Sequence, residues 1–239
     1  MLLALFLIDL AAGLYLFLPL VGRRNAGVKF YRLIFFVSGA LALCSLVGRV
    51  SILPIVVVAL TIVVYVTLRY PKRLIFRIPV AFLGIAYLAA AIEVWRVATA
   101  ASWVWSAVGA IASIALLGSV NLAMLLGHWY LVVRGMTIDP LKRLTIATLA
   151  SAILRAIVVT VVLLLPGVWS AIAIRQGIFF WMRVGWGIVG PLALYPMVWG
   201  TVKIRSTMAA TGILYVDVVA VVIGEVLGGW LSVLGHLPL

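Results

Sequence analysis

The sequence has few of the residues that catalytic and metal-binding sites usually require. Its 239 residues include five acidic residues, two histidines and one cysteine. The single cysteine, Cys44, excludes a disulfide framework and a cysteine-ligated metal site, and no histidine–carboxylate spacing typical of a metal site is present. GxSxG, P-loop, dinucleotide-binding and zinc-binding motifs are also missing. These absences leave no motif that would assign a catalytic activity to the chain.

Charge of either sign is scarce as well. Charged residues make up 10% of the chain and hydrophobic residues 67%, against about 25% and 45–50% in soluble domains. We therefore expect one integral membrane domain over residues 1–239, an all-α bundle in contact with the lipid bilayer. The net charge of +13 could suit nucleic acid, but the basic residues form short clusters between apolar segments, as in membrane proteins. No nucleic-acid partner is expected.

The apolar segments predict about eight transmembrane helices at about 20 residues per span. The first segment lacks a basic n-region and a cleavage site, so it is interpreted as a span and not as a signal peptide. Pro54 is expected to end the second helix, and an interfacial loop with Trp169 and Arg175 should follow the sixth. The expected helices are Leu2–Leu20, Leu33–Leu53, Ile55–Leu68, Ile78–Ala98, Trp103–Val133, Asp139–Pro166, Gly177–Val202 and Ser206–Leu234.

The basic residues predict the orientation. Alternate loops hold 13 of the 18 lysines and arginines, and such an excess marks the cytoplasmic side. We therefore expect a multi-pass protein of the inner (plasma) membrane with both termini on the outer side. The 13 residues are Arg23, Arg24, Lys29, Arg32, Arg69, Lys72, Arg73, Arg77, Arg134, Lys142, Arg143, Lys203 and Arg205.

One charge at the centre of a span organises the expected bundle. The segment Asp139–Pro166 carries Arg155 near its middle, and a cation at the bilayer centre costs at least about 2.5–3.5 kcal/mol on insertion scales. Arg155 should therefore pair with an acid from another helix. Asp217 is the expected partner, because both residues lie about eleven positions from the cytoplasmic start of their spans. Asp9 is the alternative.

Further charges extend this site into a polar network. Glu93 and Arg96 are three residues apart on one helix and can pair directly, while Asp217 and Glu225, about 12 Å apart along their helix, can serve two layers of one polar region. Intramembrane ionisable groups are functional candidates by default; the alternative is that they only hold helices together. The expected network comprises Asp9, Glu93, Arg96, Arg155, Arg183, Asp217 and Glu225.

The seventh span is the irregular one. Its glycines and prolines predict a kink or break near Gly190-Pro191. Broken backbone at membrane depth persists only where it is buried in protein or lines a cavity. A transport pathway and an ordinary proline kink are both compatible with this pattern. In the eighth span, Gly224 and Gly228 have the spacing that lets helices approach closely.

A second group of polar residues lies on the fifth helix. Asn121 and His128 are seven residues apart and share a helical face, with Tyr130 close by. They could contact a quinone or another polar ligand, or His128 could belong to an interfacial aromatic belt with Trp129 and Tyr130. Haem is not expected, because the second histidine, His236, belongs to the opposite side of the membrane.

The opening LFLIDLAAGLYLFLPLVGRR, with LAAG inside an apolar first span, resembles the polysulfide-reductase-type quinone-interacting membrane subunits. The resemblance covers about the first 45 residues and the number of spans. It implies an eight-helix subunit without haem that anchors redox partners. Our leading hypothesis is therefore a membrane subunit of a respiratory or other electron-transfer complex that anchors redox partners and could contact quinone or conduct protons. On the enzyme side it would be at most a non-catalytic or quinone-interacting subunit of an oxidoreductase complex. The alternatives are a small-solute or proton-coupled transporter and, third, a lipid-modifying enzyme.

Overall fold

The computed structural model describes residues 1–47, 51–67, 73–133 and 135–239, and within these ranges it leaves out the side chains of 24, 73–78 and 171–176. The described residues are almost entirely helical and contain no strand, which confirms the all-α prediction. Their elements are α1 (Leu2–Val21), α2 (Arg23–Ser45), α3 (Ile52–Thr67), α4 (Arg73–Thr99), α5 (Trp103–Val132), α6 (Asp139–Leu163), α7 (Val168–Val184), the π-helix η1 (Gly185–Val189), α8 (Gly190–Lys203) and α9 (Thr207–Gly235).

Length and hydropathy identify a multi-pass membrane protein. Seven helical segments of the described chain are long and apolar enough to cross a membrane, with α7, η1 and α8 together supplying one of them, from Gly177 to Lys203. The eighth apolar helix, α3, has 16 residues, about 24 Å at 1.5 Å per residue. That is shorter than a hydrocarbon core of about 30 Å, so α3 would cross a membrane only where the bilayer is locally thinned.

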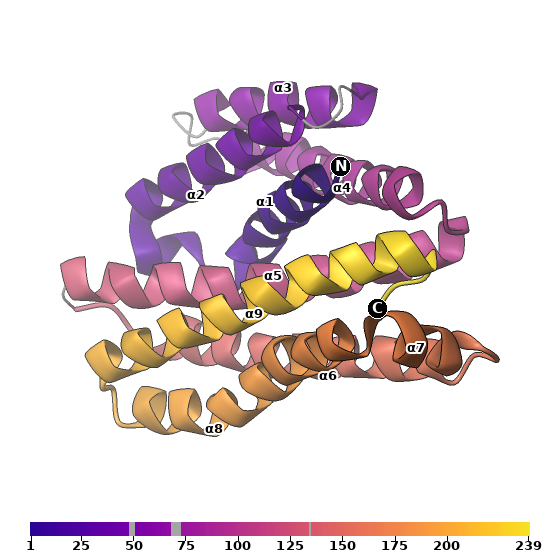
Figure 1. Ribbon diagram of the computed structural model, residues 1–239. Coiled ribbons are helices and arrows are strands. Elements are labelled where there is room, and N and C mark those ends of the chain that lie inside the picture. Colours follow the sequence, from indigo (N-terminus) through magenta and orange to yellow (C-terminus); the bar gives the residue numbers. More distant parts are fainter. Residues whose placement is uncertain (48–50, 68–72, 134) are drawn as a thin grey trace.

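Helices α1 and α5 form the centre of the bundle. In their most apolar 18-residue windows 61% and 72% of the residues are buried, against 28% in the span from Gly177 to Lys203. The two helices cross backbone to backbone, since a Cβ on Gly13 would lie 2.5 Å from the Cα of Gly118. Figure 1 shows α3 at one edge of the bundle, α6 and α8 at the other, and α1, α5 and α9 between them.

Three expected helix boundaries are wrong, and the two in basic segments share one physical reason. α2 begins at Arg23, within the expected basic loop, and bends at Gly27, whose φ is 76°; it ends at Ser45, so Pro54 lies in the first turn of α3 and not at the end of α2. The expected interfacial loop around Trp169 is helical as α7. Basic residues mark where the bilayer ends, but lysine and arginine are good helix formers and the helix continues through them.

The expected break in the seventh span is a π-helix. From Val168 to Lys203 the backbone stays helical through α7, η1 and α8, with η1 directly before Gly190-Pro191. A π-helical turn accommodates the proline without opening the chain. The sequence pattern therefore located the irregularity correctly but not its form.

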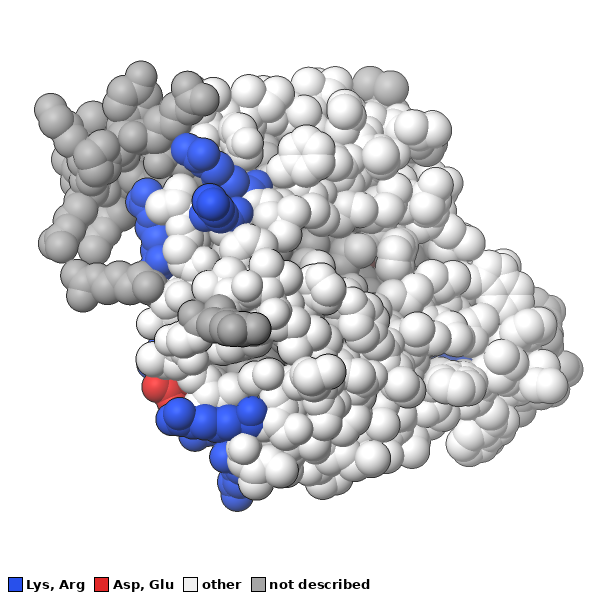
Figure 2. Space-filling model, turned by 90° about the vertical axis from the view of Figure 1, so that its left-hand side faces the viewer, with Lys and Arg blue, Asp and Glu red and all other residues white. Residues whose placement is uncertain are grey.

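The two ends of the bundle differ in charge. Trp129 Nε1 donates to the carbonyl of Ala26 at 3.3 Å, and Gly127 packs against Thr211, so the α1–α2, α5–α6 and α8–α9 connections meet at one end. Figure 2 shows lysine and arginine side chains gathered on one side of that face. The described residues of this basic end are Arg23, Lys29, Arg32, Lys142, Arg143, Lys203 and Arg205. Arg49, Arg69, Lys72 and Arg134 lie outside the described residues.

Both chain ends lie at the opposite end of the bundle. Met1 lines a small cavity with Val97 near the end of α4, and His236 Nδ1 lies 2.6 Å from the carbonyl oxygen of Thr99. This shared end agrees with an even number of membrane crossings. The side of the membrane that it faces remains a prediction.

Candidate functional site

A carboxylate held by two arginines forms the most buried polar site of the described chain. Glu225 Oε1 accepts hydrogen bonds from Arg155 Nε at 3.0 Å and Arg183 Nη2 at 2.8 Å, and Glu225 Oε2 accepts one from Arg155 Nη2 at 3.0 Å. The arginine side chains are 0% exposed and the glutamate side chain 1%. The bidentate geometry between Arg155 and Glu225 is the strongest arrangement of such a pair.

Glycines on two helices make room for Arg183. A Cβ on Gly228 would lie 2.5 Å from Arg183 Nε, and a Cβ on Gly187 would clash with Arg183 Nη1 and lie 2.7 Å from the Cα of Gly224. The guanidinium therefore fills the space where side chains of η1 and α9 would project. This explains the two glycines of α9, whose predicted close-packing role is confirmed.

The last residues of the described chain cover this cluster. Arg155 Nη2 also donates to the carbonyl oxygen of Leu239 at 3.2 Å. The amide of Leu239 donates to Ser232 Oγ at 2.9 Å, and Pro238 lies next to Gly109. The segment 236–239 thus folds back into the bundle and excludes water from the arginine–glutamate cluster.

A second buried acid lies beside the cluster. Asp9 is 0% exposed and accepts a hydrogen bond from Trp95 Nε1 at 2.7 Å. Ser113 on α5 lies near the carboxylates of both Asp9 and Glu225, and Asp9 Oδ1 has no hydrogen-bond partner among the described residues. A line of polar groups therefore extends from Trp95 on α4 through Asp9 and Ser113 to Glu225 and its two arginines. It joins helices α1, α4, α5, α6, α7 and α9.

The expected partner of Arg155 is wrong. Arg155 pairs with Glu225 and not with Asp217, because α6 begins at Asp139 and Arg155 lies 16 residues beyond its first residue. In α9, Glu225 lies 18 residues beyond Thr207 and Asp217 only 10. Counting depth from the first apolar residue placed Arg155 about one turn too close to the basic end.

Asp217 itself is buried apart from the cluster. It is 2% exposed, and its Oδ1 has no hydrogen-bond partner in the described part of the chain. The predicted second polar layer on α9 therefore exists, but it consists of a single carboxyl group among the described residues.

Glu93 and Arg96 do not form the expected direct pair in the described structure. Glu93 Oε1 accepts a hydrogen bond from Ser51 Oγ at 2.7 Å, and the Arg96 guanidinium lies over the ring of Trp103 at 4.3 Å from its centroid. Arg96 is exposed. A cation–π contact keeps the charge at the interface, so neither residue belongs to the arginine–glutamate cluster.

The polar residues of α5 are not brought together into one site. Asn121 is buried and donates to the carbonyl of Leu117 on its own helix. His128 is exposed, with its Nδ1 3.5 Å from the hydroxyl of Tyr215, and the Tyr130 hydroxyl donates to the carbonyl of Thr137. None of the three lines either cavity discussed below. Their role as ligand contacts therefore stays a prediction without support from geometry.

A lateral cavity reaches the cluster from the surface that the helices present to lipid. It lies between α1 and α9, has a volume of about 220 Å³, and is lined by apolar side chains and by Glu225. The other lining residues are Leu2, Leu3, Leu5, Phe6, Val226 and Gly229. The charge pattern predicted Glu225 as a network member but not Ser113, Trp95 or the segment 236–239, because none of these residues adds a charge to an apolar span.

No protein-family model matches this chain, and neither the curated proteins nor the solved structures contain a match. The resemblance to the polysulfide-reductase-type subunits therefore remains a prediction from the first span and the number of helices.

Proposed function

We propose that the protein is a non-haem, quinone-interacting membrane subunit of a respiratory or other electron-transfer assembly. The observation that carries the proposal is the lateral cavity between α1 and α9, whose apolar lining includes Glu225, the residue whose carboxylate is held by two arginines. A quinone combines an apolar body with a head that exchanges protons whenever it exchanges electrons. A lipid-side apolar cavity with an ionisable group at its base fits both properties.

The size of the cavity supports a headgroup site. At about 220 Å³ it is smaller than the roughly 300–1,000 Å³ of pockets that enclose a whole drug-sized molecule. A quinone ring would occupy it while the isoprenoid tail lay along the exposed apolar surface of α1 and α9. Leu3 of α1 and Val226 of α9 are exposed on this surface.

Glu225 has the chemistry for the proton step. Oxidation of one quinol to quinone at this site releases two protons and two electrons: the protons pass in turn to a Glu225 oxygen and onward through Ser113 to Asp9, and the two electrons leave to redox groups of a partner subunit. Arg155 and Arg183 hold the carboxylate in place and stabilise its negative charge. The line through Ser113 and Asp9 offers the proton further polar groups inside the bundle.

The decisive experiment fills the cavity without touching the cluster. A Cβ on Gly229 would make ordinary contacts of 3.6 and 3.7 Å with Leu5 and Leu2, so Gly229→Ala fits, whereas the longer side chain of Gly229→Leu must enter the cavity. We expect quinone recovered by solvent extraction of the protein purified in mild detergent to fall about tenfold in Gly229→Leu and to stay unchanged in Gly229→Ala. Equal recovery from both variants, or no quinone with the wild type, contradicts the quinone site.

The proposed membership of an electron-transfer assembly is tested by the proteins that co-purify with this chain. Purification in mild detergent should retain redox subunits, because the described chain has little mass outside its helices. A homogeneous monomer or homodimer with no redox partner contradicts the subunit role.

A transporter is the second candidate, and a separate observation favours it. The π-helix η1 lies within a membrane span next to the buried cluster, and the buried Asp217 has an oxygen with no partner among the described residues. π-helical turns are frequent at functional sites, and ionisable groups inside membranes mark ion and proton paths. Proton-driven uptake by the protein alone in liposomes, abolished by Asp217→Asn, would favour this function over the electron-transfer role.

A further inference from the structure

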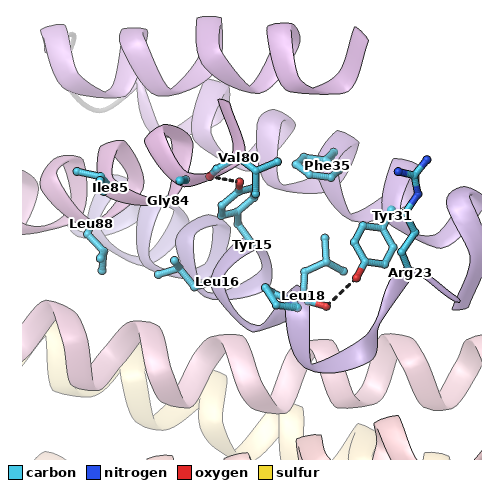
Figure 3. Close-up of a pocket in the computed structure, with 12 residues that line it drawn as sticks. Tyr15, Leu16, Leu18, Arg23, Tyr31, Phe35, Val80, Gly84, Ile85 and Leu88 are labelled. Atoms are coloured by element: carbon cyan, nitrogen blue, oxygen red, sulfur yellow. Dashed lines mark hydrogen bonds between the residues drawn. The ribbon is translucent and has the colours of Figure 1, made fainter. Parts of the chain in front are cut away.

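A second and larger cavity lies on the other side of α1, away from Glu225. It has a volume of about 460 Å³ and lies between α1, α2 and α4. Figure 3 shows Arg23 and Tyr31 at one end and Ile85 and Leu88 at the other, with Tyr15 between them. Most of the wall is aliphatic or aromatic, and Arg23 is the charged residue among the described residues that line the cavity.

The hydroxyl groups of the wall are already used within the protein. Tyr15 donates to the carbonyl of Val80 at 2.6 Å, and Tyr31 donates to the carbonyl of Leu18 at 3.2 Å. The two tyrosines therefore contribute ring surface and leave the guanidinium of Arg23 as the polar end. A neutral head that needs several hydrogen-bond donors is poorly matched to this wall, whereas an anionic head is well matched.

Backbone geometry holds Arg23 at the cavity. Gly22 and Gly27 have φ angles of 73° and 76°, in the left-handed region that glycine adopts without strain. These two turns fold the segment between them back against the end of α1, next to Pro19 and Leu18. The same segment belongs to the basic end of the bundle, where Lys29 and Arg32 add positive charge on α2.

We propose that this cavity binds an anionic phospholipid, with an acyl chain in the apolar trough along α1 and α4 and the phosphate at Arg23. The volume falls within the range of pockets that enclose a ligand. A guanidinium carries five N–H donors and binds phosphate in a bidentate manner, so Arg23 can hold a phosphate while it keeps its contacts within the protein. The site is independent of the quinone proposal, because the two cavities share no lining residue.

The first experiment compares headgroups on the wild-type protein. Phosphatidylglycerol and phosphatidylcholine with identical acyl chains are titrated into the delipidated protein in detergent, and native mass spectrometry measures occupancy. Attraction of about 1 kcal/mol per basic residue predicts about fivefold tighter binding of phosphatidylglycerol. Equal affinities for the two lipids would overturn the anionic assignment.

The second experiment separates the site from general surface charge. Arg23→Gln should remove the fivefold preference. Arg143→Gln is the matched control, because Arg143 is exposed at the same basic end on α6 and does not line the cavity; it should keep the preference. Equal losses in both variants would show that phosphatidylglycerol binds the basic surface and not the cavity.

The third experiment blocks the trough. A Cβ on Gly84 would make ordinary contacts of 3.5 and 3.6 Å with Leu16 and Tyr15, so Gly84→Ala should bind both lipids normally, whereas Gly84→Leu should lose both at least about tenfold. If Gly84→Leu does not fold, Ala81→Phe at the exposed rim replaces it. Normal binding to a folded blocked variant, or recovery of a neutral quinone as the molecule that the block displaces, overturns the proposal.

Discussion

Glu225 pairs with two arginines, whereas each of these arginines pairs with Glu225 alone among the described acids. This difference determines how much each substitution in the cluster destabilises the protein. Removing either arginine leaves Glu225 with the other one, whereas removing the glutamate charge takes away the one carboxylate that both buried arginines contact among the described residues. Breaking a buried pair costs about 3–5 kcal/mol because an uncompensated charge stays in a medium of low polarity. The residue that the cluster depends on most is therefore the acid.

We predict that Glu225→Gln is more destabilising than Arg155→Met or Arg183→Met. The loss for Glu225→Gln should be about 3–5 kcal/mol, and the loss for each arginine variant smaller, because the remaining salt bridge compensates Glu225. Unfolding of the purified protein in mixed micelles with increasing denaturing detergent measures the free energies. Asp217→Asn is the matched control, a neutralised buried acid outside the cluster, and should change stability by less than either arginine variant. Losses of the same size in all three cluster variants would contradict the shared role of Glu225.

At the residue scale, the sequence predicted that Arg155 needs an acidic partner but did not predict which acid it is. A lone arginine in an apolar segment requires an acid, and only a few acids lie in the predicted membrane spans. The network members Asp9, Arg155, Arg183 and Glu225 could therefore be predicted from the sequence. Which of them meet depends on where each helix begins, and an error of about one turn exchanges Asp217 for Glu225.

Among the elements, the α7–η1–α8 segment combines an irregular turn with the close packing of a charged side chain. A Cβ on Gly187 of η1 would meet Arg183 and Gly224, whereas a Cβ on Gly185 of the same turn would project into open space among the described residues. The two glycines are two residues apart but lie in different surroundings. Substitutions at the two positions therefore test separately whether glycine is required for packing against Arg183 or for the backbone of the π-helix.

We predict opposite outcomes for alanine at these two positions. Gly187→Ala should lower the free energy of unfolding by about 1–3 kcal/mol, because the methyl group must displace the Arg183 guanidinium or the backbone of α9. Gly185→Ala should be neutral or slightly stabilising, because the methyl group clashes with none of the described residues. Unfolding in mixed micelles measures both values. Similar destabilisation by the two variants would mean that the turn itself requires glycine.

Helix identity was predictable at the element scale, and helix ends were not. Apolar length alone located α1, α5, α6 and α9 to within a few residues, because a span of about 20 apolar residues must be helical in lipid. The errors at Arg23 and Val168 arise where helices continue beyond the bilayer. Water and headgroups tolerate both helix and loop there, so hydropathy carries no signal for the boundary.

For the whole molecule, the polar groups divide between the two ends. The basic end joins the α1–α2, α5–α6 and α8–α9 connections and adjoins the cavity at Arg23, whereas the arginine–glutamate cluster lies toward the end that carries both chain ends. Charge counting predicted the asymmetry from the sequence. The cavities could not be predicted, because each depends on how apolar side chains of separate helices fail to fill the space between them.

We predict that the basic end faces the cytoplasm, because basic loops are retained there during insertion. Ser170 and Ser206 offer a matched pair for the test in a Cys44→Ser background: Ser170 follows α6 at the end opposite to the basic end, and Ser206 precedes α9 at the basic end. A membrane-impermeant maleimide should label Ser170→Cys in cells whose inner membrane is intact and label Ser206→Cys only after that membrane is permeabilised. Serine and cysteine differ by one atom, so neither substitution should disturb the fold. The reverse labelling pattern would invert the topology and place the phospholipid cavity in the outer leaflet, where anionic lipid is less abundant and Arg23 would have fewer phosphates to bind.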